Sequence, residues 1–394
     1  MKKKIKISIL GSTGSIGYTL LKIIKQNQSK FKIILLTTNK NYKKVFKQAK
    51  IFNVKNIIII DKKSYLKAKQ DINYAKYNIY NDFSCFKKIF KSKADYTMSA
   101  ITGIEGLKPT TDIIRYTKKI AIANKEAIIC GWSFIKKELQ KYKVDFIPVD
   151  SEHFSIWFGL KNLKINTVKK IYITASGGPF LRLNRNKLNQ IKISDALNHP
   201  NWKMGKKISI DSATMMNKVF EIIEAKKIFN IAYEHLSILI HPKSYIHAII
   251  VFKNGMIKII AHQTSMTIPI VNSVDENMFL NLSNSLKPNL LNLKNLNDLN
   301  LKQINSKQFP LIKILNKLTD NDSLLETAVV AANDELVNLY LNGKISFTEI
   351  DKLLLRFLRN KKILQLKHMK PKDIEEINYL NKYVRLNINK NIYR

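Results

Sequence analysis

The chain has 394 residues, of which 45% are hydrophobic and 25% charged, with only 12 Gly and 2 Cys. This composition is typical of a globular protein of two or three domains, and it excludes a disordered chain, a collagen-like chain and a disulfide scaffold. The formal charge is +39, from 68 basic against 29 acidic residues. Because nearly all the basic residues are Lys and rise together with Asn and Ile, a bias toward A/T-rich codons explains them. We expect attraction of anionic substrates but no specific nucleic-acid partner.

No run approaches the roughly 20 apolar residues that span a bilayer, so no membrane partner is expected. The apolar stretch Ile5–Leu10 after the basic start is short, is broken by polar residues and leads into a Gly-rich turn, which favours a strand over a signal peptide. Cys85 and Cys130 are far apart and have no CxxC partner, which is typical of reduced, buried thiols. These features predict a cytoplasmic protein.

Residues 1–150 alternate strand and helix patterns. This alternation predicts an α/β fold whose first domain is a Rossmann-like, doubly wound parallel sheet. The predicted strands are Ile5–Leu10, Lys32–Thr37, Asn56–Ile60, Tyr96–Ser99, Ile120–Ala123 and Val144–Val149.

Residues 151–275 predict a central α/β catalytic domain with a mixed sheet, including a hairpin at Asn254-Gly255. Residues 276–305 are rich in Asn, Leu and Lys without a clear period, which indicates a linker, and residues 306–394 predict a C-terminal α-helical domain. The predicted strands of the central domain are Val168–Thr174, Leu236–Ile240, Ala248–Phe252 and Met256–Ala261. The predicted C-terminal helices are Leu311–Leu318, Leu324–Leu341, Phe347–Leu358 and Asp373–Val384.

The turn after the first predicted strand carries Gly11, Gly14 and Gly17 in the spacing GxxGxxG, a variant of the dinucleotide-binding GxGxxG. Such a turn lets the backbone approach a pyrophosphate, and the following helix offers free N–H groups. A plain tight turn is the alternative. The position at the start of a long series of strands and helices favours a dinucleotide site.

The end of the second predicted strand, Thr37 to Asn41, contains no acidic residue. NAD sites usually place Asp or Glu there to hold the ribose 2′-hydroxyl. A cation at Lys40, flanked by the amides of Asn39 and Asn41, suits a 2′-phosphate instead. The sequence therefore favours NADPH.

Asp150, Glu152 and His153 follow the predicted strand Val144–Val149, at the end of a strand where α/β folds place their chemistry. Two carboxylates side by side suit Mg²⁺ or Mn²⁺, although this spacing is also common by chance.

A second cluster lies at a predicted helix. Asn217, Lys218 and Glu221 share one helix face, and Ser212 lies near the start of that helix. A hydroxyl, an amide, an ammonium group and a helix N-terminus together form a phosphate clamp. A solvated helix face is the alternative.

Two loops complete the pattern. Ser176 begins a Ser-Gly-Gly run after a predicted strand and offers a hydroxyl and bare N–H groups to an anion. The loop His199–Gly205 carries Trp202 and is bounded by Pro and Gly, so it can close over a substrate. Core packing is the alternative for Trp202.

Taken together, these stretches resemble the 1-deoxy-D-xylulose 5-phosphate reductoisomerase family, in order, in spacing and over nearly the full length. The matching segments are Gly11–Gly17, Ala123–Glu126, Pro148–His153, Ala175–Phe180, His199–Gly205, Asp211–Lys218 with Glu221, His241–His247 and Ala331–Glu335. The resemblance implies an NADPH-dependent, metal-dependent homodimeric enzyme. It would rearrange and reduce 1-deoxy-D-xylulose 5-phosphate, a small phosphorylated ketose, to 2-C-methyl-D-erythritol 4-phosphate in isoprenoid precursor synthesis.

The resemblance also implies residue roles. The metal would be held by Asp150, Glu152 and Glu221, and these residues with Lys125 and His153 would be catalytic. The cofactor would be bound by Thr13, Gly14, Ser15, Ile16, Asn39, Lys40, Asn41, Asn124, Glu126 and Gly205. The substrate would contact Lys125, Ser151, Glu152, Ser176, His199, Trp202, Met204, Ser212, Asn217, Lys218, Glu221 and His247. The family usually has Gly where this chain has Asn39, and Asn tolerates a left-handed backbone better than most residues.

Three other interpretations stay open at this point: another NADPH enzyme such as a semialdehyde or homoserine dehydrogenase, a nucleic-acid-binding protein, and an inactive relative. A semialdehyde dehydrogenase needs a nucleophilic Cys, and neither Cys85 nor Cys130 has a suitable setting; a homoserine dehydrogenase leaves the Ser-Gly-Gly run and the Trp202 loop unexplained. A nucleic-acid-binding protein would be expected to gather its basic residues in a recognition motif. An inactive relative would have lost some of the expected ligands, which are all present.

Overall fold

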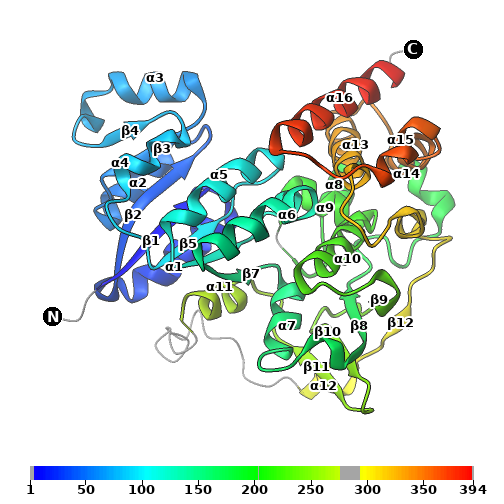
Figure 1. Ribbon diagram of the computed structural model, residues 1–394. Coiled ribbons are helices and arrows are strands. Elements are labelled where there is room, and N and C mark those ends of the chain that lie inside the picture. The colour runs from blue at the N-terminus through cyan, green and yellow to red at the C-terminus, as the bar shows by residue number, and fades with distance from the viewer. Residues whose placement is uncertain (1–3, 203, 276–292, 393–394) are drawn as a thin grey trace. The chain divides into compact units, whose positions relative to one another are not determined.

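The structure of the protein is a computed structural model that describes residues 4–202, 204–275 and 293–392 (Figure 1). The described residues form two compact units. The first comprises residues 4–127, 134–154 and 266–275, and the second comprises residues 128–133, 155–202, 204–265 and 293–392. The four-part division made from the sequence stays a prediction. In the two-unit division, residues 266–275 go with the N-terminal part, and the C-terminal helices go with the central sheet.

The first unit is built on a seven-stranded sheet of order β4-β3-β2-β1-β5-β6-β7, in which every neighbouring pair is parallel. The strand order reverses between β1 and β5, so the sheet is doubly wound, as predicted. Ligands of such sheets bind at the carboxyl ends of the strands beside this reversal. The strands are β1 (Ile5–Leu10), β2 (Phe31–Thr38), β3 (Asn56–Ile59), β4 (Asn78–Tyr80), β5 (Tyr96–Ser99), β6 (Lys119–Ile122) and β7 (Asp145–Pro148).

Helices and strands of the first unit bury one apolar core. Helix α1 (Ser15–Gln26) turns Leu20, Leu21 and Ile24 into it, as expected of an amphipathic helix. Helix α11 (Thr267–Val274), distant in sequence, joins the same core, and its Ser273 hydroxyl lies 2.7 Å from the buried Tyr96 hydroxyl. The other helices are α2 (Tyr42–Phe52), α3 (Lys62–Gln70), α4 (Phe86–Ile89), α5 (Leu107–Ile113) and most of α6 (Lys125–Tyr142).

The second unit contains a five-stranded mixed sheet of order β11-β10-β8-β9-β12. Only the β8–β9 pair is parallel, and Gly255, with φ +88°, lies in the predicted turn between β10 and β11. The predicted mixed sheet and its hairpin are therefore confirmed. The strands are β8 (Val168–Ala175), β9 (Leu236–Ile240), β10 (Ile246–Phe252), β11 (Ile257–Ala261) and β12 (Lys302–Gln303).

In the second unit, α13 (Leu324–Leu341) is buried on nearly every side and packs most extensively against α16 (Ile374–Ile392). The predicted helix Leu311–Leu318 is instead a 3₁₀ segment, Pro310–Lys317. The remaining helices are α7 (Ser151–Gly159), which begins in the first unit, α8 (Ile193–Leu197), α9 (Lys206–Ala213), α10 (Met216–Phe229), α12 (Leu293–Asn297), α14 (Phe347–Phe357) and α15 (Lys361–Gln365).

The predicted linker 276–305 needs a correction where it is described. Residues 276–292 lie outside the described residues, but residues 293–305 contain α12 and β12, and β12 pairs antiparallel with β9. This part of the segment is therefore an edge strand and a short helix rather than a plain connection.

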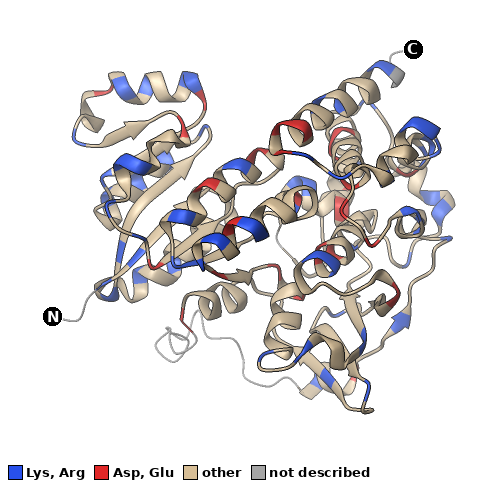
Figure 2. Cartoon of the chain, viewed as in Figure 1, with Lys and Arg blue, Asp and Glu red and all other residues tan. Residues whose placement is uncertain are grey.

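Figure 2 shows Lys and Arg recurring along most helices of both units rather than in one element. Within the described ranges, no helix combines the length and apolar character that crossing a bilayer requires.

Candidate active site

The Gly-rich turn connects β1 to α1 in the first unit. Gly17 has no room for a side chain, because a Cβ there would lie 2.5 Å from the Gly11 carbonyl oxygen. Gly14 precedes α1 without a side-chain cap, and the first turn of α1 carries no acidic residue. Gly14 and Ser15 are exposed, Thr13 and Ile16 are half-buried, and the free N–H groups of the helix suit a phosphate.

Side chains from β2 and α2 brace this turn. The Gly11 N–H donates to the Thr37 hydroxyl at 2.8 Å, and the Lys44 ammonium donates to the Thr13 carbonyl oxygen at 2.8 Å. The Gln48 amide donates to the Ser12 carbonyl oxygen at 3.0 Å and accepts from the Ser12 hydroxyl at 2.8 Å. Neither Lys44 nor Gln48 was singled out from the sequence, because no motif spacing connects them to the turn.

The three residues predicted to meet a 2′-phosphate follow β2 and are all exposed. Asn41 caps α2 by accepting from the Lys44 N–H at 3.3 Å. Asn39 is not among the described residues with positive φ. The Gly that is usual at this position is therefore not needed for a left-handed backbone here.

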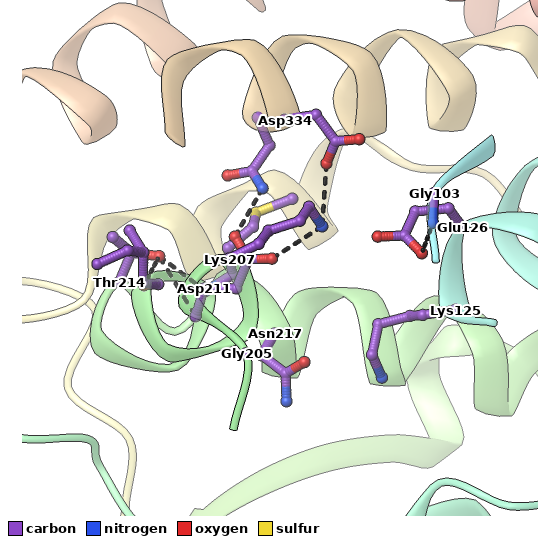
Figure 3. A network of polar contacts seen from close by, with 12 residues as sticks. Gly103, Lys125, Glu126, Gly205, Lys207, Asp211, Thr214, Asn217 and Asp334 are labelled. Atoms are coloured by element: carbon purple, nitrogen blue, oxygen red, sulfur yellow. Dashed lines mark hydrogen bonds and ion pairs between the residues drawn. The ribbon is translucent and has the colours of Figure 1, made fainter. Parts of the chain in front are cut away.

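Asn124 and Glu126 hold the loop that follows β5. The Asn124 amide donates to the Gly103 carbonyl oxygen at 2.8 Å, and its oxygen caps α6 by accepting from the Ala127 N–H. The Glu126 carboxylate accepts from the Gly103 N–H at 3.3 Å, as Figure 3 shows. Both predicted cofactor residues thus fix a loop at the carboxyl end of the sheet.

Asp150 lies just beyond β7, directly before α7. Its carboxylate forms an ion pair with the Lys125 ammonium at 2.9 Å and lies 3.4 Å from Nδ1 of the fully buried His153. Burial raises the pKa of Asp150, but Lys125 and then His153 outweigh it and hold the pKa well below its usual range. Asp150 is therefore an anion at neutral pH.

Ser151 and Glu152 occupy the first turn of α7, next to Asp150. The Ser151 hydroxyl donates to the Glu152 carboxylate, and both residues are buried. The Glu152 N–H donates to the Asp150 carboxylate at 3.3 Å. The sequence predicted that the carboxylates of Asp150 and Glu152 lie side by side, and the start of α7 places them next to each other.

The Ser176 hydroxyl is oriented by two neighbours in the second unit. It lies 3.1 Å from His199 Nε2 and accepts from the Gly178 N–H at 3.1 Å. His199 Nδ1 accepts the backbone N–H groups of Asn201 and Trp202 at 3.1 and 3.0 Å. Because Nδ1 accepts, Nε2 carries the proton and donates to Ser176, which leaves the Ser176 proton available for an anion.

His199 is neutral. Burial, and to a smaller extent the positive charge of Lys218, together lower its pKa to about 4. Because Lys218 affects the pKa of His199, its ammonium lies close enough to interact electrostatically with the Ser176–His199 pair.

Ser212 lies against the same turn. Gly178 has φ +68°, and a Cβ there would lie 2.9 Å from the Ser212 carbonyl oxygen. Ser212 belongs to the last turn of α9, four residues before α10, and so lies near the start of α10 as predicted. The close approach explains why only Gly fits at this position.

Helix α10 presents the remaining polar residues of the predicted clamp. Asn217 and Lys218 both contact the Glu221 carboxylate, and Lys218 and Glu221 are buried. Their contacts confirm the shared helix face. A solvated face is wrong for this helix, because nearly all of α10 is buried.

The loop before α9 carries the aromatic residue. Trp202 is half-buried, and its ring meets the His247 ring edge-on with 6.1 Å between centroids. His247 in turn stacks on His262 at 3.7 Å. Met204 is half-buried and Gly205 begins α9, while Lys203 between Trp202 and Met204 lies outside the described residues. The contribution of His262 had no sequence signal, because stacking depends on the fold.

Three family models match successive parts of the chain. Residues 7–131 match the family described as 1-deoxy-D-xylulose 5-phosphate reductoisomerase, and residues 146–229 and 262–387 match two C-terminal domains of that enzyme. A 1-deoxy-D-xylulose 5-phosphate reductoisomerase from Pelagibacter ubique is 58% identical over 97% of this chain and 98% of that protein. The chain belongs to the 1-deoxy-D-xylulose 5-phosphate reductoisomerase family.

Other members of the reductoisomerase family are more distant but match at similar length. One from Wolbachia sp. subsp. Drosophila simulans is 36% identical over 88% of each chain. A solved reductoisomerase with NADPH, fosmidomycin and magnesium aligns with a TM-score of 0.87 at 28% identity over 98% of each chain. The reductoisomerase from Zymomonas mobilis with NADPH aligns at 0.84 and 28% identity over all of each chain. Membership of the reductoisomerase family excludes the semialdehyde dehydrogenase, homoserine dehydrogenase and nucleic-acid-binding interpretations.

Proposed function

We propose that this chain converts 1-deoxy-D-xylulose 5-phosphate to 2-C-methyl-D-erythritol 4-phosphate with NADPH and a divalent metal ion. Family membership over nearly the whole chain supports the reaction. The observation that carries the substrate assignment is the cluster of Ser176, His199, Ser212 and Lys218 in the second unit, which suits the phosphate of a small ketose.

NADPH is assigned to the turn between β1 and α1. The pyrophosphate would meet the N–H groups of residues 13–16, and Lys40 with its flanking amides would face the 2′-phosphate. Asn124, Glu126 and Gly205 complete the proposed cofactor contacts. The relatives solved with NADPH support this assignment.

The donor chemistry of Asp150 and Glu152 fits Mg²⁺ or Mn²⁺. Asp150 stays ionised, Glu152 lies beside it, and hard carboxylate oxygens are what these ions prefer. Glu221 in the second unit is the third proposed ligand, and a relative solved with magnesium supports the group. NADPH would supply a hydride, and the ion would supply positive charge that stabilises negative charge on the substrate oxygens.

The protein side chains then have separate tasks. Ser176, Ser212, Asn217 and Lys218 would hold the phosphate away from the reacting carbons and so orient the ketose. Lys125, paired with Asp150, would stabilise negative charge on a substrate oxygen.

Trp202, Met204 and His247 would cover the substrate and exclude water. Ser151 and His199 would contact the oxygens of the substrate, and His153 would hold Asp150.

A homodimer is the proposed assembly. Strand β11 is an edge of the mixed sheet, and Ile257 and Ile259 on it are 57% and 49% exposed. An exposed apolar edge strand is usually covered, here by a second copy. Light scattering of the purified protein tests this. We also place the enzyme in the cytoplasm, where the buried free thiols of Cys85 and Cys130 suit a reducing compartment, and cell fractionation tests that location.

The test of the reaction is loss of NADPH absorbance on adding 1-deoxy-D-xylulose 5-phosphate, with Mg²⁺, with Mn²⁺ and with a chelator. We expect oxidation of NADPH only with a metal, and little oxidation of NADH. Folded protein that binds NADPH but shows no oxidation would contradict the proposed reaction and leave the dinucleotide site standing.

A further inference from the structure

Helix α9 connects two parts of the proposed substrate site. It begins at Gly205, the end of the Trp202 loop, and Ser212 lies in its last turn. The helix has only eight residues, no side-chain cap at Gly205 and no acidic residue in its first turn. Isolated helices of this length are marginal in water, so contacts with the rest of the unit must fix α9.

Helix α9 is fixed in place by the contacts of a buried carboxylate. Asp211, next to Ser212, is 2% exposed. The fully buried Asn333 amide on α13 donates to its Oδ1 at 2.7 Å, and the Lys207 ammonium lies 3.0 Å from its Oδ2. A buried carboxylate without such partners is costly, so these contacts hold one face of α9 against α13.

Lys207 extends the same network to the C-terminal helices. Its ammonium also pairs with Asp334 of α13 at 2.9 Å, and Figure 3 shows it between Asp211 and Asp334. Arg385 of α16 pairs with the other Asp334 oxygen at 2.7 Å and with Glu335 at 3.4 Å. Three helices that are far apart in sequence therefore share one chain of ion pairs.

We propose that Asn333 is a positioning residue for the substrate phosphate. This inference rests on the proposed function. It means that the C-terminal helices contribute to the affinity for the substrate phosphate. Asn333, with Lys207 and Asp334, sets the place of α9 and so keeps Ser212 against the Ser176–Gly178 turn. Asn333 contacts no reacting atom in this account and acts through Asp211.

Asn333→Ala tests the role. Loss of a hydrogen bond to a charged group is expected to raise KM for 1-deoxy-D-xylulose 5-phosphate about tenfold. KM for NADPH and kcat are expected to change less than KM for the phosphorylated substrate, because Gly205 is the only proposed cofactor contact at α9 and the others belong to the first unit. Asn338→Ala is the matched control, since Asn338 lies exposed on the same helix and its side chain contacts Asn342.

Two further variants separate positioning from a general structural role. The first is the double variant Asp211→Asn with Asn333→Asp, which exchanges the carboxylate and the amide between the two positions. Its KM for the phosphorylated substrate should return toward the wild-type value. Lys207→Gln changes a side chain that is 31% exposed, so it tests the network without emptying a buried position, and it should also raise KM for the phosphorylated substrate.

The outcomes are distinct. An unchanged KM for the phosphorylated substrate in both Asn333→Ala and Lys207→Gln, with only a lower melting temperature, would overturn the inference. A rise in KM that the exchange reverses would support it. A folded wild-type enzyme that does not turn over 1-deoxy-D-xylulose 5-phosphate would overturn the proposed function and the inference together.

Discussion

The Gly11–Gly17 turn of the first unit and the Ser176–Gly178 turn of the second both follow a buried strand, but they offer different groups to a phosphate. The first presents helix N–H groups, and the side chains of Lys44 and Gln48 donate hydrogen bonds to backbone carbonyl oxygens of this turn. The second presents the Ser176 hydroxyl, which lies against His199, and the buried Lys218 acts electrostatically on His199. A diester pyrophosphate carries less charge per phosphorus than a phosphate monoester dianion, which suits backbone donors in one turn and an ammonium in the other.

The largest effect is expected from the carboxylate that Lys218 contacts. Glu221→Gln should lower kcat at least about 100-fold, because a metal ligand that stabilises developing charge is worth several kcal/mol. NADPH affinity, measured by fluorescence titration, should stay the same. Glu234→Gln is the control, since that side chain is 77% exposed. Unchanged turnover of Glu221→Gln would remove Glu221 from the proposed metal site.

Lys218→Ala removes the ammonium group from the proposed phosphate site of the second unit. We expect KM for the phosphorylated substrate to rise about 10- to 100-fold, the range of a hydrogen bond to a charged group. Steady-state kinetics at two ionic strengths would measure it, and Ser176→Ala should give a smaller rise. If KM for NADPH rose instead, the two turns would not have the separate tasks assigned to them.

A pair of glycine variants compares the turns directly. Gly17→Ala forces a Cβ against the Gly11 carbonyl oxygen, and Gly178→Ala forces one against Ser212. Strain of about 1–3 kcal/mol should raise the KM of the matching ligand about tenfold, NADPH for Gly17→Ala and the phosphorylated substrate for Gly178→Ala. Equal effects of either variant on both ligands would contradict the comparison.

The smallest effect concerns pH. The pKa of His199 is lowered from 6.5 to about 4 by burial and Lys218, so between these values the unfolded chain binds a proton that the folded chain does not. Stability should therefore fall as pH drops through this window and be constant above it. Urea midpoints of wild type and His199→Gln from pH 4.5 to 7.5 would measure the difference, and identical slopes would disprove it.

The sequence was most informative where pattern and packing agree. Strands β1, β5 and β9 and helix α13 have their predicted bounds, because period and burial coincide there. Strand β4 was missed because three residues carry no period. The 3₁₀ segment from Pro310 has an apolar pattern that also fits an α-helix.

Contacts between side chains could be predicted from the sequence only where both residues lie in one helix. Lys218 and Glu221 meet within one helix, so their spacing predicts their contact. Lys207 and Asp334 are far apart in sequence, and only the packing of α9 on α13 brings them within 2.9 Å. The proposed roles of the site residues stay predictions until variants are measured.

The cap of α2 has a consequence for engineering. Asn41 lies just after β2, in the segment where NAD enzymes carry an acid, and its side chain accepts the Lys44 N–H. Asp caps a helix as well as Asn does, so Asn41→Asp introduces a negative charge at the proposed 2′-phosphate position without giving up the cap. The braces of the turn, Lys44 and Gln48, stay in place. We therefore expect Asn41→Asp to shift coenzyme preference toward NADH at little cost to folding.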